Sequence, residues 1–187
     1  RDEILKLRDP QFNSDNVCVV TGAGTGIGRA TAVAVATNKL MTVGLDINAE
    51  EGHKTQKLAR DMGGQMIFLQ CDLTRDKDIE LAVSEAAKIG TVKYLANIAG
   101  IQHIDPIDNF PMEKYDQMQA LMLRAPFYLS KLIIPHMQNS NDGKGVIGNM
   151  ASIHAHICTK NKPAYNITKF GLRALSQSIS AEGEGKI

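Results

Sequence analysis

The chain has 187 residues, of which 43% are hydrophobic and 22% charged, and its formal net charge is +1. This length suits one α/β domain with a sizeable core. The near-zero charge argues against a nucleic-acid or membrane partner attracted by electrostatics, and no apolar run has the length needed to span a bilayer. The three cysteines are far apart and lack metal-ligand spacing, so we predict no metal site and a reducing, cytoplasmic setting.

Short apolar runs alternate with helical patterns, which predicts a parallel sheet covered by helices on both faces. The expected strands are Val17–Thr21, Met41–Asp46, Gln65–Gln70, Lys93–Ile98 and Val146–Ala151, and the expected helices are Ile27–Asn38, Ala49–Met62, Arg75–Ile89, Met112–Gln138 and Pro163–Glu182. Pro126 and Pro135 should kink or divide the fourth helix. We predict a single doubly wound domain over 1–187, with an N-terminal extension over 1–15. Another strand is expected after the last helix, so we also predict that the domain is incomplete at the C-terminus and lacks a substrate loop there.

A glycine-rich segment, Thr21–Gly28, follows the first strand and opens the first helix. Glycines let the backbone turn sharply and approach a pyrophosphate, and the helix N-terminus offers free N–H groups to phosphates. This position predicts a Rossmann-type dinucleotide site, with a purely structural turn as the alternative. Asp46 ends the second strand, where a carboxylate accepts hydrogen bonds from an adenosine ribose and repels a 2′-phosphate. We therefore predict NAD as the cofactor, with a solvated aspartate as the alternative.

Ser152, Tyr165 and Lys169 form a candidate catalytic group. Ser152 is expected to end the fifth strand, and Tyr165 and Lys169 are four residues apart on one face of the last helix. A nearby ammonium group stabilises a phenolate, so Tyr165 can act as general acid and base on an alcohol or carbonyl. Ser152 can hold the same oxygen in line for hydride transfer. A solvated helix face is the alternative interpretation of the Tyr–Lys pair.

These motifs, with TGxxxGxG first, resemble the short-chain dehydrogenase/reductase family from about Val17 to the end of the chain. The resemblance implies that Asp72 contacts the adenine, that Asn97–Gly100 is the NNAG motif with its second Asn replaced by Ile, and that Lys169 also holds the nicotinamide ribose. It further implies a homotetramer built through the two long helices. The implied cofactor-binding residues are Gly22, Thr25, Gly26, Ile27, Gly28, Asp46, Ile47, Asp72, Leu73, Asn97, Ala99, Gly100, Tyr165 and Lys169.

One position departs from the family. A catalytic Asn is usual in the long fourth helix, in a context like NxxGxF, and Met122 stands at that place in the segment Met122–Phe127. A thioether is only a weak acceptor and cannot replace an amide that holds a water. Slower turnover, support of the water by another group, and loss of activity are all open.

Two segments, Asn97–Pro111 and Met150–Tyr165, resemble the D-3-hydroxybutyrate dehydrogenases of this family. In those enzymes the positions of Gln102, His154 and Lys162 bind the substrate carboxylate, and an amide, an imidazole and an ammonium can all donate to one carboxylate. With Ser152 and Tyr165 these are the expected substrate-binding residues. We expect NAD-dependent interconversion of (R)-3-hydroxybutyrate and acetoacetate. The alternatives are a family member acting on another alcohol or ketone, such as a sugar, steroid or acyl thioester, and a non-catalytic NAD(H)-binding member.

Overall fold

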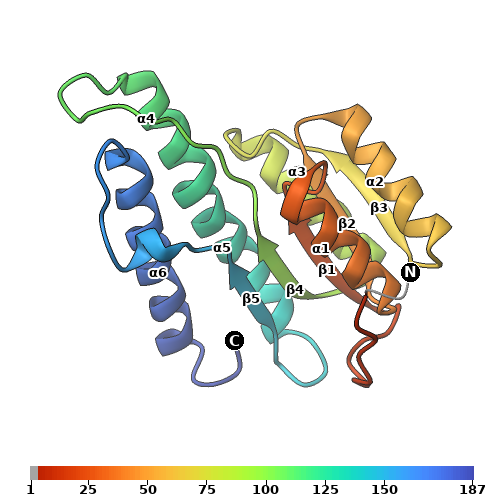
Figure 1. The fold of residues 1–187 in the computed structure, drawn as a ribbon. Helices are drawn as coiled ribbons and strands as arrows, with labels where there is room; N and C mark the ends of the chain where they lie inside the picture. Colours follow the sequence, from red (N-terminus) through yellow and green to blue (C-terminus); the bar gives the residue numbers. More distant parts are fainter. Residues whose placement is uncertain (1–3) are drawn as a thin grey trace.

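The computed structural model describes residues 4–187, so residues 1–3 of the expected N-terminal extension lie outside the described residues. Within them, five parallel strands form one sheet in the order β3-β2-β1-β4-β5 (Figure 1). The strands are β1 (Asn16–Thr21), β2 (Met41–Asp46), β3 (Met66–Gln70), β4 (Thr91–Asn97) and β5 (Val146–Asn149). The predicted parallel sheet is confirmed. The strand order reverses between β1 and β4, which is where doubly wound sheets bind ligands.

Six α-helices pack around the sheet in the described part of the chain (Figure 1). They are α1 (Gly26–Thr37), α2 (Ala49–Asp61), α3 (Asp76–Ile89), α4 (Met112–Gln119), α5 (Ala125–Gln138) and α6 (Pro163–Glu182). Among residues 4–187, no helix is both long and apolar enough to cross a membrane.

The central strand β1 is buried on both faces because its alternating side chains enter two different cores. Val17 and Val19 pack with apolar residues of α3 and α5, whereas Cys18 and Val20 pack with those of α1 and α2. A strand buried in this way needs an almost continuous apolar sequence, which is the pattern that made it recognisable. The two cores fix the carboxyl end of β1, where the glycine-rich segment begins.

The fourth helical region is divided just before the first of its two prolines. A turn of π-helix, Ala120–Arg124, separates α4 from α5, and the Ala125 N–H bonds five residues back to the Ala120 carbonyl. Pro126 follows in the first turn of α5, directly after the π-helical turn. Pro135 lies inside α5, which continues to Gln138.

The fifth strand is shorter than expected. β5 ends at Asn149, so Ser152 lies three residues beyond it rather than at its end. Met150 still donates its N–H to the Asn97 carbonyl at 2.8 Å. After that bond the chain leaves the sheet, and Ser152 caps a short 3-10 turn over Ile153–Ala155.

Candidate active site

The glycine-rich segment between β1 and α1 has no room for side chains at two of its positions. A methyl group on Gly28 would lie 1.9 Å from the Gly22 carbonyl oxygen, and one on Gly22 would lie 2.9 Å from the Ala99 Cα atom. Gly22 also has a φ of 67°, in the left-handed region that side chains disfavour. These glycines therefore hold three backbone segments in close contact at the carboxyl ends of β1 and β4.

Hydrogen bonds fix the same segment. The half-buried Asp46 carboxylate accepts the Gly24 N–H at 2.8 Å. The Thr21 hydroxyl oxygen accepts the N–H groups of Ile98 and Ala99, at 2.9 and 3.1 Å. Arg29 donates to the Gly24 carbonyl. The segment is thus preorganised, with N–H groups of a helix N-terminus beside it.

A cleft of about 530 Å³ opens beside this segment. Eleven of the expected cofactor-binding residues line it, namely Gly22, Thr25, Gly26, Ile27, Gly28, Asp46, Ile47, Asp72, Leu73, Ala99 and Gly100. Sequence reasoning missed Cys71, Thr74, Ile98, Ile101, Gln117, Leu121 and Met150, which line it too. The glycines leave room for a pyrophosphate, and the remaining lone pairs of the Asp46 carboxylate suit ribose hydroxyls, so the residues present fit a nicotinamide dinucleotide.

Asn97, by contrast, lies outside the lining of this cleft. Its side chain is buried and donates to the Asn149 Oδ1 at 2.8 Å, while Asn149 donates to the Ser176 hydroxyl at 2.9 Å. Asn97 Oδ1 has no hydrogen-bond partner among the described residues 4–187. The side chain therefore ties β4 to β5 and α6.

Lys169 connects α6 to the wall of the cleft. Its ammonium donates to the carbonyl oxygen of Met150, a cleft-lining residue, at 2.6 Å. The same nitrogen lies 5.3 Å from the centre of the Tyr165 ring, one helical turn earlier. Burial lowers the pKa of the Lys169 side chain from its usual value. Tyr165 is half-buried and makes no hydrogen bond through its hydroxyl within residues 4–187. This leaves the phenol available to a ligand, with a cation beside it.

His154 contacts both Ser152 and Tyr165. Ser152 Oγ lies 3.1 Å from His154 Nδ1, and His154 Nε2 lies 2.8 Å from Thr159 Oγ1. The His154 ring meets the Tyr165 ring edge-on, with the ring centres 5.5 Å apart. Both imidazole nitrogens are thus engaged by hydroxyl groups, which the sequence did not indicate.

The other two expected substrate residues lie on loops that touch. Gln102 is exposed, next to the cleft-lining Ile101, and Lys162 is half-buried at the N-terminal end of α6. The Asp105 N–H donates to the Asn161 carbonyl at 2.9 Å, which joins the two loops. Gln102 and Lys162 therefore lie near the same edge of the site, although neither lines the cleft.

Met122 lies inside the π-helical turn and is 1% exposed. It packs with Met118 and Ala164, and Tyr165 lies against this cluster. A methyl group on Gly100 would lie 3.1 Å from its sulfur. Met122 therefore reaches the region between the cleft and Tyr165, where it offers an apolar surface.

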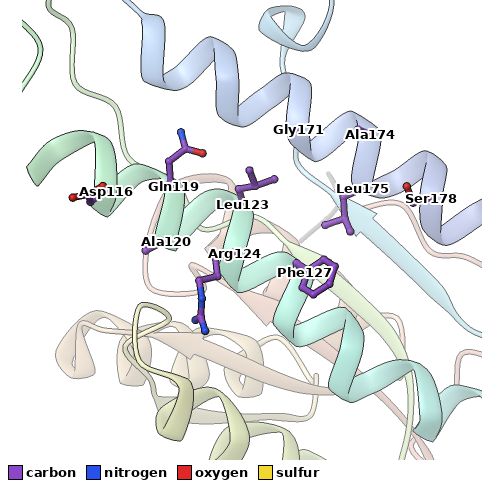
Figure 2. Close-up of a pocket in the computed structure, with 10 residues that line it drawn as sticks. All are labelled: Asp116, Gln119, Ala120, Leu123, Arg124, Phe127, Gly171, Ala174, Leu175 and Ser178. Carbon is purple, nitrogen blue, oxygen red and sulfur yellow. The ribbon is translucent and has the colours of Figure 1, made fainter. Parts of the chain in front are cut away.

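A second hollow, of about 610 Å³, lies between α6 and the segment formed by α4, the π-helical turn and α5. Figure 2 shows Leu123 and Phe127 facing Leu175 of α6 across it. None of the expected site residues lines this hollow, so it is separate from the candidate active site.

Comparison with known proteins gives relatives of one kind. A family model described as short chain dehydrogenase matches residues 16–186. The chain is 32% identical to a 7alpha-hydroxysteroid dehydrogenase of Escherichia coli over 94% of this chain and 71% of that one. It is 30% identical to a D-beta-hydroxybutyrate dehydrogenase of Rhizobium meliloti over 88% of this chain and 64% of the relative.

Among solved structures, a metagenomic short-chain oxidoreductase in complex with NADP superposes with a TM-score of 0.87 at 27% identity, covering 92% of this chain and 78% of that one. The chain spans 65% of the length of two further curated oxidoreductases that it matches. The family match, the fold and the placement of the glycine-rich segment agree, and the chain belongs to the short-chain dehydrogenase family of oxidoreductases.

Proposed function

We propose that the protein transfers a hydride between NAD and a short-chain 3-hydroxy acid, with (R)-3-hydroxybutyrate and acetoacetate as the pair. One observation carries the proposal. The Tyr165 phenol lies beside the Lys169 ammonium, and that ammonium is bonded to Met150 in the wall of the cleft. An acid/base group is thereby held at the edge of a cleft that suits a dinucleotide.

The glycine-rich segment, Asp46 and Lys169 would hold the cofactor, which supplies the hydride acceptor or donor when bound. The choice of NAD rests on Asp46, whose negative charge at the end of β2 opposes a 2′-phosphate. Glu51 lies near the same segment and forms an ion pair with Arg29, so this cation is already neutralised and less able to attract a phosphate.

The chain's own residues move the proton. In the oxidation direction Tyr165 takes the proton of the substrate hydroxyl at its phenolate oxygen, and the Lys169 ammonium stabilises that phenolate. The Ser152 hydroxyl hydrogen-bonds the same substrate oxygen and fixes its direction. In the reduction direction Tyr165 returns the proton.

The carboxylate would be bound by Gln102, His154 and Lys162. The hydrogen bond from the Asp105 N–H to the Asn161 carbonyl joins the loop that carries Gln102 to the loop that carries Lys162. The His154 ring packs against Tyr165. An ammonium donor adds charge to these contacts and favours an acid over a neutral alcohol.

A second candidate is a family member that acts on another alcohol or binds NAD(H) without turnover. The observation that favours it is the buried Met122, which packs in the cluster beside Tyr165 where the family has an amide. NADH binding without oxidation of any candidate alcohol would support a non-catalytic role. Oxidation of a neutral alcohol alone would support a different substrate.

The assembly we propose is a homotetramer, as the family resemblance implies. The apolar hollow of Figure 2 supports a contact through α5 and α6, because Phe127 at its edge is 57% exposed. We also propose a cytoplasmic setting, which the free thiols of Cys18, Cys71 and Cys158 support.

The test is NADH formation by the purified protein with (R)-3-hydroxybutyrate, its (S) enantiomer and a neutral secondary alcohol. The proposal predicts turnover that is selective for the (R) acid. Equal rates with the neutral alcohol would contradict a carboxylate-binding site. Silence with all three, while NADH still binds, would contradict the hydroxybutyrate assignment.

A further inference from the structure

A chain of hydrogen bonds leads from Ser152 through His154 to Thr159. Ser152 Oγ lies 3.1 Å from His154 Nδ1, and His154 Nε2 lies 2.8 Å from the Thr159 hydroxyl. The His154 backbone N–H also donates to Ser152 Oγ, at 3.3 Å. Thr159 has no part in the reaction described above, yet it is bonded to a residue that contacts the catalytic serine.

A neutral imidazole carries one donor and one acceptor nitrogen, so this chain has two possible arrangements. In the first, the Thr159 hydroxyl donates to His154 Nε2, and Nδ1–H donates to Ser152 Oγ. In the second, Nε2–H donates to Thr159, and the Ser152 hydroxyl donates to Nδ1. Only the first leaves the Ser152 proton free for the substrate oxygen, on which negative charge develops as a ketone is reduced.

We propose that Thr159 is a positioning residue, whose hydroxyl donates to His154 Nε2 and so favours the tautomer that keeps the Ser152 hydroxyl directed at the substrate oxygen. The inference rests on the proposed roles of Ser152 and Tyr165, and it replaces carboxylate binding by His154, because in this arrangement neither ring nitrogen has a proton left for the carboxylate. The protonated nitrogen of a histidine is set by the hydrogen bond that its other nitrogen makes. Thr159 is the partner of that other nitrogen.

Thr159 is held where this role requires it. Its carbonyl accepts the side-chain N–H of Asn166, a buried residue of α6 next to Tyr165, at 3.0 Å. Asn161, with a φ of 62°, turns the chain between Thr159 and α6. Thr159 is thus tied to the helix that carries Tyr165, and both residues contact His154.

The experiment compares Thr159→Val, which removes the hydroxyl at nearly constant shape, with Thr159→Ser, which keeps it. For the valine variant we expect kcat to fall about tenfold for both the hydroxy acid and a neutral secondary alcohol, less than the roughly 10²–10³-fold cost of removing an oxyanion donor outright. KM for both and NADH affinity should stay unchanged. The serine variant should keep the wild-type kcat.

The pH profile adds a readout that a merely structural role would not move. A doubly protonated imidazole donates from Nδ1 whatever Thr159 does, so the ratio of the valine variant's kcat to that of the wild type should rise towards one as the pH is lowered. The helix α6 packs against the Ile153–Ala155 turn. Its charged and titratable groups are Tyr165, Lys169, Arg173 and Glu182, with Lys162 at its start and His156 in the adjacent loop. Both proteins contain these groups, so dividing the variant's kcat by the wild-type kcat at each pH cancels their effect.

Nitrogen-15 NMR of the imidazole rings tests the tautomer without any turnover, with the His154 signal assigned through His154→Gln. We expect Nδ1–H in the wild type and a substantial Nε2–H population in Thr159→Val. An unchanged tautomer, an unchanged kcat, or an equal loss in Thr159→Ser would each overturn the inference. A rise in KM for the acid alone would overturn it in favour of carboxylate binding. If the wild type oxidises no alcohol, the proposed function fails, while the NMR comparison still decides the tautomer.

Discussion

The two sides of the site are held in different ways. On the cofactor side, Gly22 and Gly28 touch other backbone atoms, and Gly24 bonds to Asp46 through its N–H. On the substrate side, Gln102 is exposed, and its loop is joined to the chain before α6 by the backbone bond from Asp105. The first side is fixed by backbone sterics, whereas the second depends on side chains and loop contacts. Changes on the first side should therefore affect every substrate, and changes on the second should discriminate among substrates.

Gly28→Ala should have the largest effect of the variants on the cofactor side. Its methyl group would lie 1.9 Å from the Gly22 carbonyl, and overpacking of this kind costs about 1–3 kcal/mol. NADH affinity, measured by fluorescence titration, should fall by roughly 10- to 100-fold.

Gly63→Ala is the matched control, because Gly63 has a φ of 82° and, in the described part of the chain, an added methyl group would meet no atom within 4 Å. It should lower stability by about 1–2 kcal/mol through left-handed strain alone and leave NADH affinity unchanged. Equal losses of affinity in both variants would show that the contact at Gly22 is not what matters.

Asp46→Asn separates the effect of the Asp46 charge from that of its hydrogen bond with Gly24. The amide oxygen can still accept the Gly24 N–H, so the glycine-rich segment should keep its shape while the negative charge and the exposed hydrogen bond from the Asn48 N–H are lost. We expect the preference for NAD over NADP to fall about tenfold, the scale of one charge-assisted hydrogen bond. Asp46→Ala should weaken the use of both cofactors, because it also frees Gly24. An unchanged preference in the asparagine variant would remove the argument for NAD.

Lys162→Ala, on the substrate side, should discriminate between an acidic and a neutral substrate. KM for a 3-hydroxy acid should rise about tenfold through loss of a charge-assisted contact, with little change for a neutral secondary alcohol. Lys160→Ala is the control, since Lys160 is an exposed lysine of the same loop. Equal increases in KM for the acid and the alcohol would count against a carboxylate anchor.

The stability of the fold should depend on pH through Asp142. An ion pair and hydrogen bond with the buried Lys93 lowers the pKa of Asp142 to about 2. Because the folded-state pKa is depressed, this stabilisation is present above about pH 4 and is lost as the pH falls towards 2. Asp142→Asn should lower Tm at neutral pH, and its difference from the wild type should shrink below pH 4.

Glu85→Gln removes an exposed ion pair with Lys88 and should leave Tm almost unchanged. Thermal unfolding followed by circular dichroism measures both variants across pH. A difference between Asp142→Asn and the wild type that does not depend on pH would contradict the ion pair as its cause.

The same contrast explains how much the sequence could predict. The sheet and the glycine-rich segment follow from apolar runs and from backbone sterics, which leave a local signature in the residue types. The bond from Lys169 to the Met150 carbonyl leaves none, because any residue at 150 offers that oxygen. The partner of His154 was equally hidden, since the turn at Asn161 is what returns Thr159 to the site.

The division of the fourth helical region shows a different limit. Proline rules identified Pro126 as a breaking point, and the break lies just before it. The π-helical turn lies at Ala120–Arg124, where the residue types predict an ordinary α-helix. Met122 was singled out only by the family resemblance, and its packing beside Tyr165 needed the structure.

The most direct test of the central claim is Tyr165→Phe, with NADH affinity and turnover measured on the same preparation. Removing the phenol hydroxyl should reduce turnover by roughly 10²–10⁴-fold, the usual contribution of a general acid or base. NADH affinity should stay nearly unchanged, because the cleft is lined by other residues. Loss of NADH binding in step with activity, or turnover close to that of the wild type, would contradict an acid/base role for Tyr165.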